Sequence, residues 1–229
     1  KSTQCPLMQI KQAQTIDSIE QQPNITEPLR KRRQWALRRK RRKESPNNIN
    51  QVKIGSEEGI LWSLTKMCSS TDMEKKYALF TLSVVTHHTI NASKLAQVDQ
   101  SLSNLIQLLQ HDNDNDNKCF VCVILGNLAL ENKGWKKMII DENVVSVLIH
   151  LCKETNLDLV ENASAALGNI FVSYTGDVSE VITGDKVAVL MDIISSKQTI
   201  HPLDCNQMSK IQANAAYCLA SLVTCNASI

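Results

Sequence analysis

Two short runs of side chains have the spacing of a metal site. Cys119 and Cys122 stand three positions apart, as in half of a zinc site, and the run from Asp112 to Asn117 alternates Asp and Asn like the start of a calcium loop. However, no second Cys or His pair stands at ligand spacing, and a calcium loop needs Gly at its sixth position and Glu at its twelfth, where this chain has Asn117 and Val123. We therefore predict no metal site and interpret the Asp/Asn run as a polar turn between helices.

The chain also lacks an arrangement of side chains typical of an active site. Its five histidines stand at 87, 88, 111, 150 and 201, with no nucleophile or paired carboxylate at a fixed spacing from them. The run Thr-Gly-Asp-Lys at 183–186 lacks the glycine spacing of a phosphate loop. We predict that the protein is not an enzyme, with no catalytic residue and no cofactor. Most of the eight cysteines fall within apolar helical patterns, which indicates reduced, buried thiols in a protein of the cytoplasm and nucleus.

The strongest charge feature is a basic arm near the start of the chain. Ten of the fourteen residues from 30 to 43 are basic and none is acidic. Lys and Arg total 25 against 23 acidic residues, so without the arm the balance is 15 against 23 and the rest of the chain is acidic. The arm residues that we expect to bind a partner are Arg30, Lys31, Arg32, Arg33, Trp35, Arg38, Arg39, Lys40, Arg41, Arg42 and Lys43.

Three kinds of partner fit such an arm. It can bind nucleic acid by counterion release, act as a nuclear-localisation sequence itself, or dock as a cationic helix into an acidic protein groove. Good helix formers throughout, with Trp35 and Leu37 for apolar contact, favour docking into a groove. Nucleic acid is the less favoured partner because the rest of the chain is acidic. A solvated tail without a specific partner is the remaining alternative.

The rest of the chain repeats itself. The phrase Val-Ile-Leu-Gly-Asn-Leu at 123–128 returns 42 residues later as Ala-Ala-Leu-Gly-Asn-Ile at 165–170, and weaker copies stand at 80–85 and 217–222. Upstream of each copy lies a stretch whose apolar residues recur at steps of three and four, as on one face of a helix. Self-similarity at this period predicts a helical solenoid, in which each unit buries its apolar face against its neighbours.

Each unit is predicted to hold a short first helix, a middle helix and a long third helix that carries the Leu-Gly-Asn phrase. Polar turns at 69–72, 111–117 and 153–156 separate the helices. The last spacing is 52 rather than 42 residues, and we place the extra residues in a loop at 195–208 that contains Pro202. The predicted organisation is a flexible segment at 1–29, the arm and a linker at 30–50, and four repeats at 51–90, 91–131, 132–174 and 175–229.

The composition agrees with an all-α fold. Hydrophobic residues make up 43% of the chain but aromatic ones only 4%, and seven Gly and five Pro are too few for a turn-rich β fold. No apolar run approaches the roughly 20 residues that span a bilayer. We expect the chain to be part of a longer protein, truncated at its C-terminal end, because it lacks an initiating Met and stops within a repeat.

Arm and repeats together resemble a known family. The unit of 42 residues with Ala-Leu-Gly-Asn in its third helix resembles armadillo repeats, and an arginine cluster followed by Ala-Leu-Arg-Arg-Lys-Arg at 36–41 resembles the importin-β-binding segment of importin-α, in a slightly shorter form. The long turn of the fourth unit and the Ala-Leu-Arg phrase look most like the divergent importin-α-like branch named for transmembrane and coiled-coil domains. The resemblance covers residues 29–229 and implies a right-handed superhelical solenoid preceded by a basic helical arm.

The resemblance also implies where partners bind. The arm would dock on an importin-β-like receptor, and a concave groove lined by third helices would hold a nuclear-localisation peptide between Trp and Asn residues four positions apart. In this chain the Asn positions hold Asn127 and Asn169 but also Val84 and Ser221, and the Trp positions hold Phe80, Val123, Ala165 and Tyr217. Since the tryptophans are missing, we expect weak binding of a Lys-rich signal. The two asparagines can either bind the backbone of a partner or bond adjacent turns of the protein itself.

Two functions follow from these observations. The first is an importin-α-like adaptor in nuclear protein import, with the arm on an importin-β-like receptor and a peptide or helix in the groove. The second is an armadillo scaffold without transport activity that assembles a cytoskeletal or ciliary complex. Binding of nucleic acid through the arm is a third and less favoured interpretation.

Overall fold

The computed structural model describes residues 46–57, 59–131, 133–172, 174, 182–195 and 205–226. Residues 49–229 form one compact unit and residues 1–48 another, of which only 46–48 are described, as the start of a helix. All regular structure within the described ranges is α-helical, in agreement with the predicted all-α solenoid. The segment 1–29 and the basic arm at 30–43 lie outside the described residues.

The helices follow the predicted order of three to a unit. In chain order they are α3 (Pro46–Ser56), α4 (Ile60–Met67), α5 (Asp72–Val85), α6 (Thr89–Leu95), α7 (Ser101–His111), α8 (Asn115–Glu131), α9 (Lys133–Asp141), α10 (Val144–Leu151), α11 (Leu157–Phe171), α12 (Gly184–Ser195) and α13 (Cys205–Asn226). The fourth unit shows two described helices, α12 and α13, and residues 175–181 before them lie outside the described ranges.

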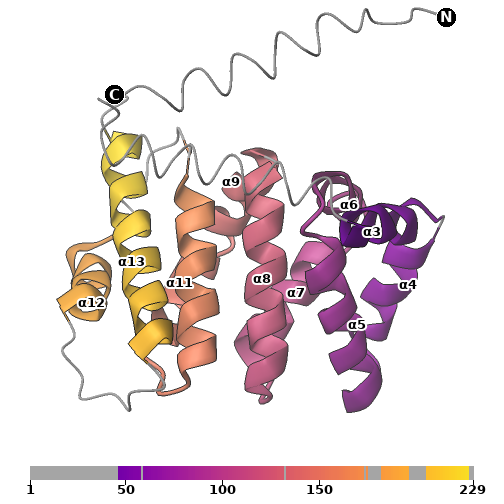
Figure 1. Cartoon of the computed structure of the whole chain (residues 1–229), viewed down its shortest axis with the longest axis horizontal. Helices are drawn as coiled ribbons and strands as arrows, with labels where there is room; N and C mark the ends of the chain where they lie inside the picture. The colour runs from indigo at the N-terminus through magenta and orange to yellow at the C-terminus, as the bar shows by residue number, and fades with distance from the viewer. Residues whose placement is uncertain are drawn as a thin grey trace, which may run out of the picture. The chain divides into compact units, whose positions relative to one another are not determined.

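The units stack through their long third helices. Helices α5, α8, α11 and α13 lie side by side in chain order (Figure 1), each in contact with the next. The second helices α4, α7, α10 and α12 each pack against the third helix of their own unit. The core between these two layers is aliphatic, as the low aromatic content requires, and its fully buried side chains include Leu79, Leu82, Leu125, Leu128 and Leu167.

The second helices begin with a repeated backbone feature. The residue before α4, α7 and α10 adopts a left-handed conformation, at Gly59 (φ 81°), Gln100 (φ 60°) and Asn143 (φ 59°). This conformation turns the chain sharply between the first and second helix of each unit. Glycine adopts it without steric cost, whereas a residue with a Cβ is held there by the surrounding packing.

Two predicted turns are shorter than expected. The Asp/Asn run leaves only residues 112–114 outside helices, because the carboxylates of Asp112 and Asp114 accept the backbone N–H groups of Asp114 and Asp116 at 2.8 Å and so begin α8 at Asn115. In the fourth unit, the predicted loop at 195–208 is wrong for its last four residues, which are the first turn of α13. Pro202 lies before that helix, and no Gly or Pro follows it to interrupt the helical pattern.

Two glycines let the third helices approach one another. A Cβ added to Gly126 in α8 would lie 3.2 Å from the Cα of Ala166, and one added to Gly168 in α11 would lie 2.8 Å from a ring carbon of Tyr217. Neither distance leaves room for a larger side chain. The glycines of the repeated Leu-Gly-Asn phrase therefore set the spacing between α8, α11 and α13, although Gly lowers the intrinsic stability of a helix.

The substitution Gly168→Leu should lower the stability of the solenoid, because the new side chain must displace the Tyr217 ring. We expect a loss of about 1 to 3 kcal/mol, which corresponds to a fall in Tm of roughly 2 to 12 °C for a domain of this size. Thermal unfolding followed by circular dichroism measures it. The substitution should cost less in a Tyr217→Ala background, and an unchanged melting curve for the single variant would contradict the packing of α11 on α13.

Candidate functional site

The third helices present one face that the second helices do not cover. Residues at equivalent positions of α5, α8 and α11 are partly or largely exposed. Their side chains therefore form rows that run from one third helix to the next. We use the name third-helix face for this surface, which consists of Met73, Tyr77, Phe80 and Val84 on α5, Phe120, Val123 and Asn127 on α8, Asn162, Ala165 and Asn169 on α11, and Tyr217 on α13.

The α5 end of this face is aromatic. Met73, Tyr77 and Phe80 follow one another at helical spacing and are 60%, 61% and 51% exposed. Phe80 meets the half-buried Phe120 of α8 edge to face, with ring centroids 5.6 Å apart and ring planes at 68°. We call these four residues the aromatic cluster. Such a contiguous exposed group of large apolar side chains is typical of a surface that a partner covers.

Only Phe80 of the aromatic cluster was among the predicted groove residues. The other three were missed because they do not occupy the Trp or Asn positions of the resembling family. A signal was present in the sequence, since α5 carries a second apolar stripe at 73, 77, 80 and 84, beside the buried stripe of Ala78, Leu79 and Leu82.

The face becomes smaller and more polar toward α11. The row that begins with Phe80 continues with the half-buried Val123 and Ala165, so no planar side chain stands in its centre. It ends at Tyr217 on α13, which is 46% exposed and whose ring lies over Gly168. The predicted groove residues of this row, Phe80, Val123, Ala165 and Tyr217, are therefore at least partly accessible to a partner. Aromatic side chains stand only at the two ends of the row.

The two asparagines of the Leu-Gly-Asn phrase lie between neighbouring third helices. The Asn127 amide donates a hydrogen bond to the Thr86 hydroxyl at 3.2 Å, and Thr86 in turn donates to the Leu82 carbonyl oxygen at 2.7 Å. This bond connects α8 to the C-terminal end of α5. The amide nitrogen of Asn169 stands 3.2 Å from the place of a Cβ at Gly126, so it fills the space that this glycine leaves.

The last predicted groove residue, Ser221, is buried, unlike the others. Ser221 is only 6% exposed, so its hydroxyl contributes little to the surface of α13. Val84, at the equivalent position of the first unit, is half-buried at the end of the apolar stripe of α5.

Ion pairs connect the N-terminal ends of the third helices. Lys75 of α5 contacts Asp112 at 2.9 Å, and Lys76 contacts Asp114 and Asp116 at 3.3 and 2.6 Å. Lys210 of α13 reaches Glu161 of α11 at 3.4 Å in the same manner. These acidic side chains therefore already have cationic partners within the protein.

The pair of Asp112 and Lys75 is the least exposed of these contacts, with the side chains 4% and 18% exposed. Burial opposes ionisation of Asp112, but the backbone N–H of Asp114, the Lys75 ammonium and the Asn117 amide outweigh it, so the pKa of Asp112 lies below its ordinary value. The hydrogen bond to Asp112 correspondingly raises the pKa of Lys75. Both groups are therefore held in their charged forms.

Four of the described cysteines are buried thiols with raised pKa values. Burial raises the pKa of Cys68 and Cys152 to about 12 and that of Cys119 to about 11, and it raises the pKa of Cys122 as well. The thiols are therefore protonated at neutral pH. Among the residues that the structure describes, no group of three or more His, Cys, Asp or Glu side chains is placed to hold a metal ion. The same residues include no helix with the length and apolar character needed to cross a membrane.

Comparisons with known proteins agree with this geometry. Residues 136–172 match the armadillo/beta-catenin-like repeat family. A search of curated protein sequences gives no significant match. Among solved structures, the chain is similar to an engineered protein at 23% identity and a TM-score of 0.62, covering 76% of this chain and 70% of that one. It is also similar to computationally designed armadillo repeat proteins for modular peptide recognition, at 19% identity and a TM-score of 0.59, covering 71% and 64%.

These likenesses show the class of fold. Together with the stacked third helices, they identify the chain as an armadillo-repeat solenoid.

The pKa of Asp112 leads to a prediction about stability and pH. Because ionised Asp112 is favoured in the folded state, its contribution is complete above the unfolded pKa of about 3.9 and is lost as the pH falls through its lower folded pKa. Asp112→Asn should therefore reduce the free energy of unfolding at pH 7 by about 1 to 3 kcal/mol. Below a pH of about 4, the free energies of unfolding of the variant and the wild type should differ less. Urea unfolding at several pH values measures this, and a difference independent of pH would contradict it.

Proposed function

We propose that this protein is a non-enzymatic adaptor whose third-helix face holds a segment of a partner protein. The observation that carries the proposal is the aromatic cluster of Met73, Tyr77, Phe80 and Phe120, three of whose side chains are more than half exposed. Large apolar side chains at the centre of an interface supply most of its binding energy, because they lose the most contact with water. A protein without a partner would gain nothing from leaving three of them in solvent on neighbouring turns of one helix.

The chemistry of the face favours an apolar or mixed partner segment over a Lys-rich one. A Lys-rich peptide needs aromatic planes to hold its side-chain stems and acidic groups to meet its cations. The central positions of the face are Val123 and Ala165, which have no ring, and the carboxylates at the end of the helices are paired with lysines. An apolar side chain of a partner fits the aromatic cluster, while the partly exposed Asn169 on α11 offers a polar group to the backbone of the partner.

The designed armadillo repeat proteins with a similar fold support this use of the surface, since they are described as made for modular peptide recognition. The likeness is one of fold at 19% identity, so it supports the location of a binding face rather than the choice of partner. The partner chemistry is argued from the side chains of this chain alone.

Within this adaptor function, we propose nuclear protein import as the process and the basic arm as the second binding element. The arm at 30–43 combines ten basic residues with Trp35 and Leu37, which suits an acidic groove of an importin-β-like receptor. The protein would then move between the cytoplasm and the nucleus. The alternative is an armadillo scaffold of a cytoskeletal or ciliary complex, which the missing ring at Val123 and Ala165 favours because such a scaffold needs no clamp for cargo cations.

Peptide binding tests the third-helix face. In a chain lacking residues 30–43, fluorescence anisotropy should show weak or absent binding of a labelled Lys-rich signal peptide and tighter binding of peptides with spaced Leu or Phe residues. Phe80→Ala should weaken the apolar peptide about tenfold, the effect of about 1.4 kcal/mol. The matched control is Met191→Ala on α12, where a Met of 51% exposure lies outside the third-helix face.

Two results of these binding measurements would contradict the proposal. Submicromolar binding of the Lys-rich peptide, lost on substitution of Asn127 and Asn169, would contradict the apolar preference and favour a cargo receptor for basic signals. Equal effects of Phe80→Ala and Met191→Ala would contradict the role of the aromatic cluster.

Capture of a receptor tests the arm. Replacing Arg38, Arg39, Arg41 and Arg42 with Ala should abolish capture of importin-β from solution, because the cations that meet its acidic groove are removed. Replacing the same residues with Lys keeps the charge and serves as the control. Capture that persists after the Ala substitutions would exclude the arm as the docking element, and efficient competition by duplex DNA at physiological salt would favour nucleic acid instead.

A further inference from the structure

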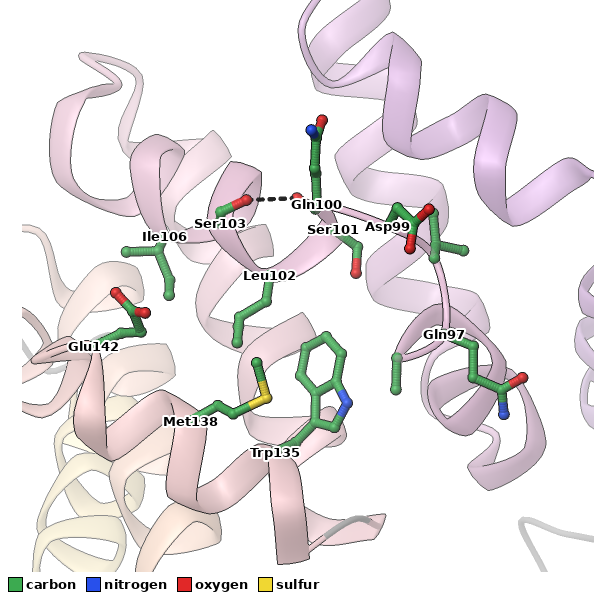
Figure 2. A pocket seen from close by; sticks show the side chains of 12 residues that line it. Gln97, Asp99, Gln100, Ser101, Leu102, Ser103, Ile106, Trp135, Met138 and Glu142 are labelled. Carbon is green, nitrogen blue, oxygen red and sulfur yellow. Dashed lines mark hydrogen bonds between the residues drawn. The ribbon is translucent and has the colours of Figure 1, made fainter.

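A second concave site lies away from the third helices. It is a pocket of about 350 Å³ between the turn from α6 to α7, the start of α7 and helix α9 (Figure 2). We call it the α7–α9 pocket. Its apolar wall consists of Leu102 and Ile106 of α7 with Trp135 and Met138 of α9. None of its lining residues belongs to α5, α8, α11 or α13, so it is separate from the third-helix face.

The pocket combines a buried apolar floor with a polar rim. Leu102, Ile106 and Trp135 are only 6 to 7% exposed, whereas Met138 is 49% exposed at the opening. Figure 2 shows the Met138 thioether and the Leu102 side chain directed toward the Trp135 ring. The volume corresponds to roughly ten water molecules at about 30 Å³ each. This is room for one or two apolar side chains of a partner, at the lower limit of pockets that hold small molecules.

The charge of the rim is one-sided. Asp99 and Glu142 are its charged residues, and they lie at opposite ends of the pocket (Figure 2). Both are exposed, and no described side chain that lines the pocket is basic. An apolar side chain in the floor would therefore have a carboxylate on either side of it, at positions that cations flanking it in a partner sequence can reach.

The backbone holds this arrangement in place. Gln100 at the rim adopts the left-handed conformation, and the hydroxyl of Ser103 donates to its carbonyl oxygen at 3.0 Å (Figure 2). The buried hydroxyl of Ser101 donates to the Leu95 carbonyl oxygen at 3.0 Å, which ties the end of α6 to the start of α7. The wall that carries Leu102 is therefore positioned before a partner arrives, and this reduces the cost of ordering on binding.

We infer that the α7–α9 pocket is a second docking site, which takes an apolar side chain of a partner protein flanked by Lys or Arg. This site shares no lining residue with the third-helix face. It allows the protein to hold two partners at once, one on each surface, as an assembling scaffold or an adaptor requires. The occupant is defined by its chemistry: Leu, Met or Phe against Trp135 and Met138, with cations at Asp99 and Glu142.

Synthetic peptides test the inference on the full chain. Short peptides with a central Leu, Met or Phe between pairs of Lys or Arg are compared with matched peptides in which Glu replaces the cations. Nuclear magnetic resonance follows the indole N–H signal of Trp135, assigned by its absence in Trp135→Phe. We expect a saturable shift of this signal with the basic peptides and none with the acidic ones. No saturable shift with any basic peptide, or equal shifts with both sets, would overturn the inference.

Surface variants identify the site without disturbing the core. Charge reversal at both Asp99 and Glu142 to Lys should weaken binding of the basic peptides about tenfold, and Met138→Glu should abolish apolar contact at the opening. The controls are Asp192→Lys on α12 and Met73→Glu in the aromatic cluster, which leave the pocket unchanged. If Met73→Glu weakens these peptides as much as Met138→Glu does, they bind the third-helix face and the second site does not exist.

Discussion

The close contact between successive third helices is the constraint on which the rest of this structure depends. At Gly126 and Gly168 the neighbouring helix comes so near that a Cβ would touch Ala166 or Tyr217. A solenoid has no closed core, so each unit is stable only as far as it packs on the next one. The small residues that allow this packing weaken their own helices, and the aliphatic core between the two layers compensates for that loss.

This constraint also shapes the exposed surface. In the row that runs from Phe80 to Tyr217, the central positions on α8 and α11 hold the smaller Val123 and Ala165, and the large side chains stand at the two ends. The same packing gives Asn127 an internal partner, because its amide reaches Thr86 across the contact between α5 and α8. Stability and binding therefore use the same helix surface, and their demands divide it into an apolar end and a more polar middle.

Polar contacts mark the two sides of the solenoid differently. At the N-terminal ends of the third helices, Lys75 and Lys76 form ion pairs with Asp112, Asp114 and Asp116 of the next unit. Around the α7–α9 pocket, Asp99 and Glu142 stand without a basic side chain among the described lining residues. Two carboxylates without a basic neighbour in the lining therefore stand beside an apolar floor, where a cationic partner segment gains most.

The sequence by itself determined the class of fold, because the repeated Leu-Gly-Asn phrase and the helical spacing of apolar residues are local properties that can be read from one chain. It also located the third helices and several residues of their exposed face, Phe80 among them. Only the tertiary structure decided that Phe80 meets Phe120, that Asn127 bonds Thr86, and that Trp135 closes a pocket with α7. Each of these contacts joins residues from different units. Contacts between residues so far apart in sequence depend on how the helices pack, and no local sequence pattern predicts that packing.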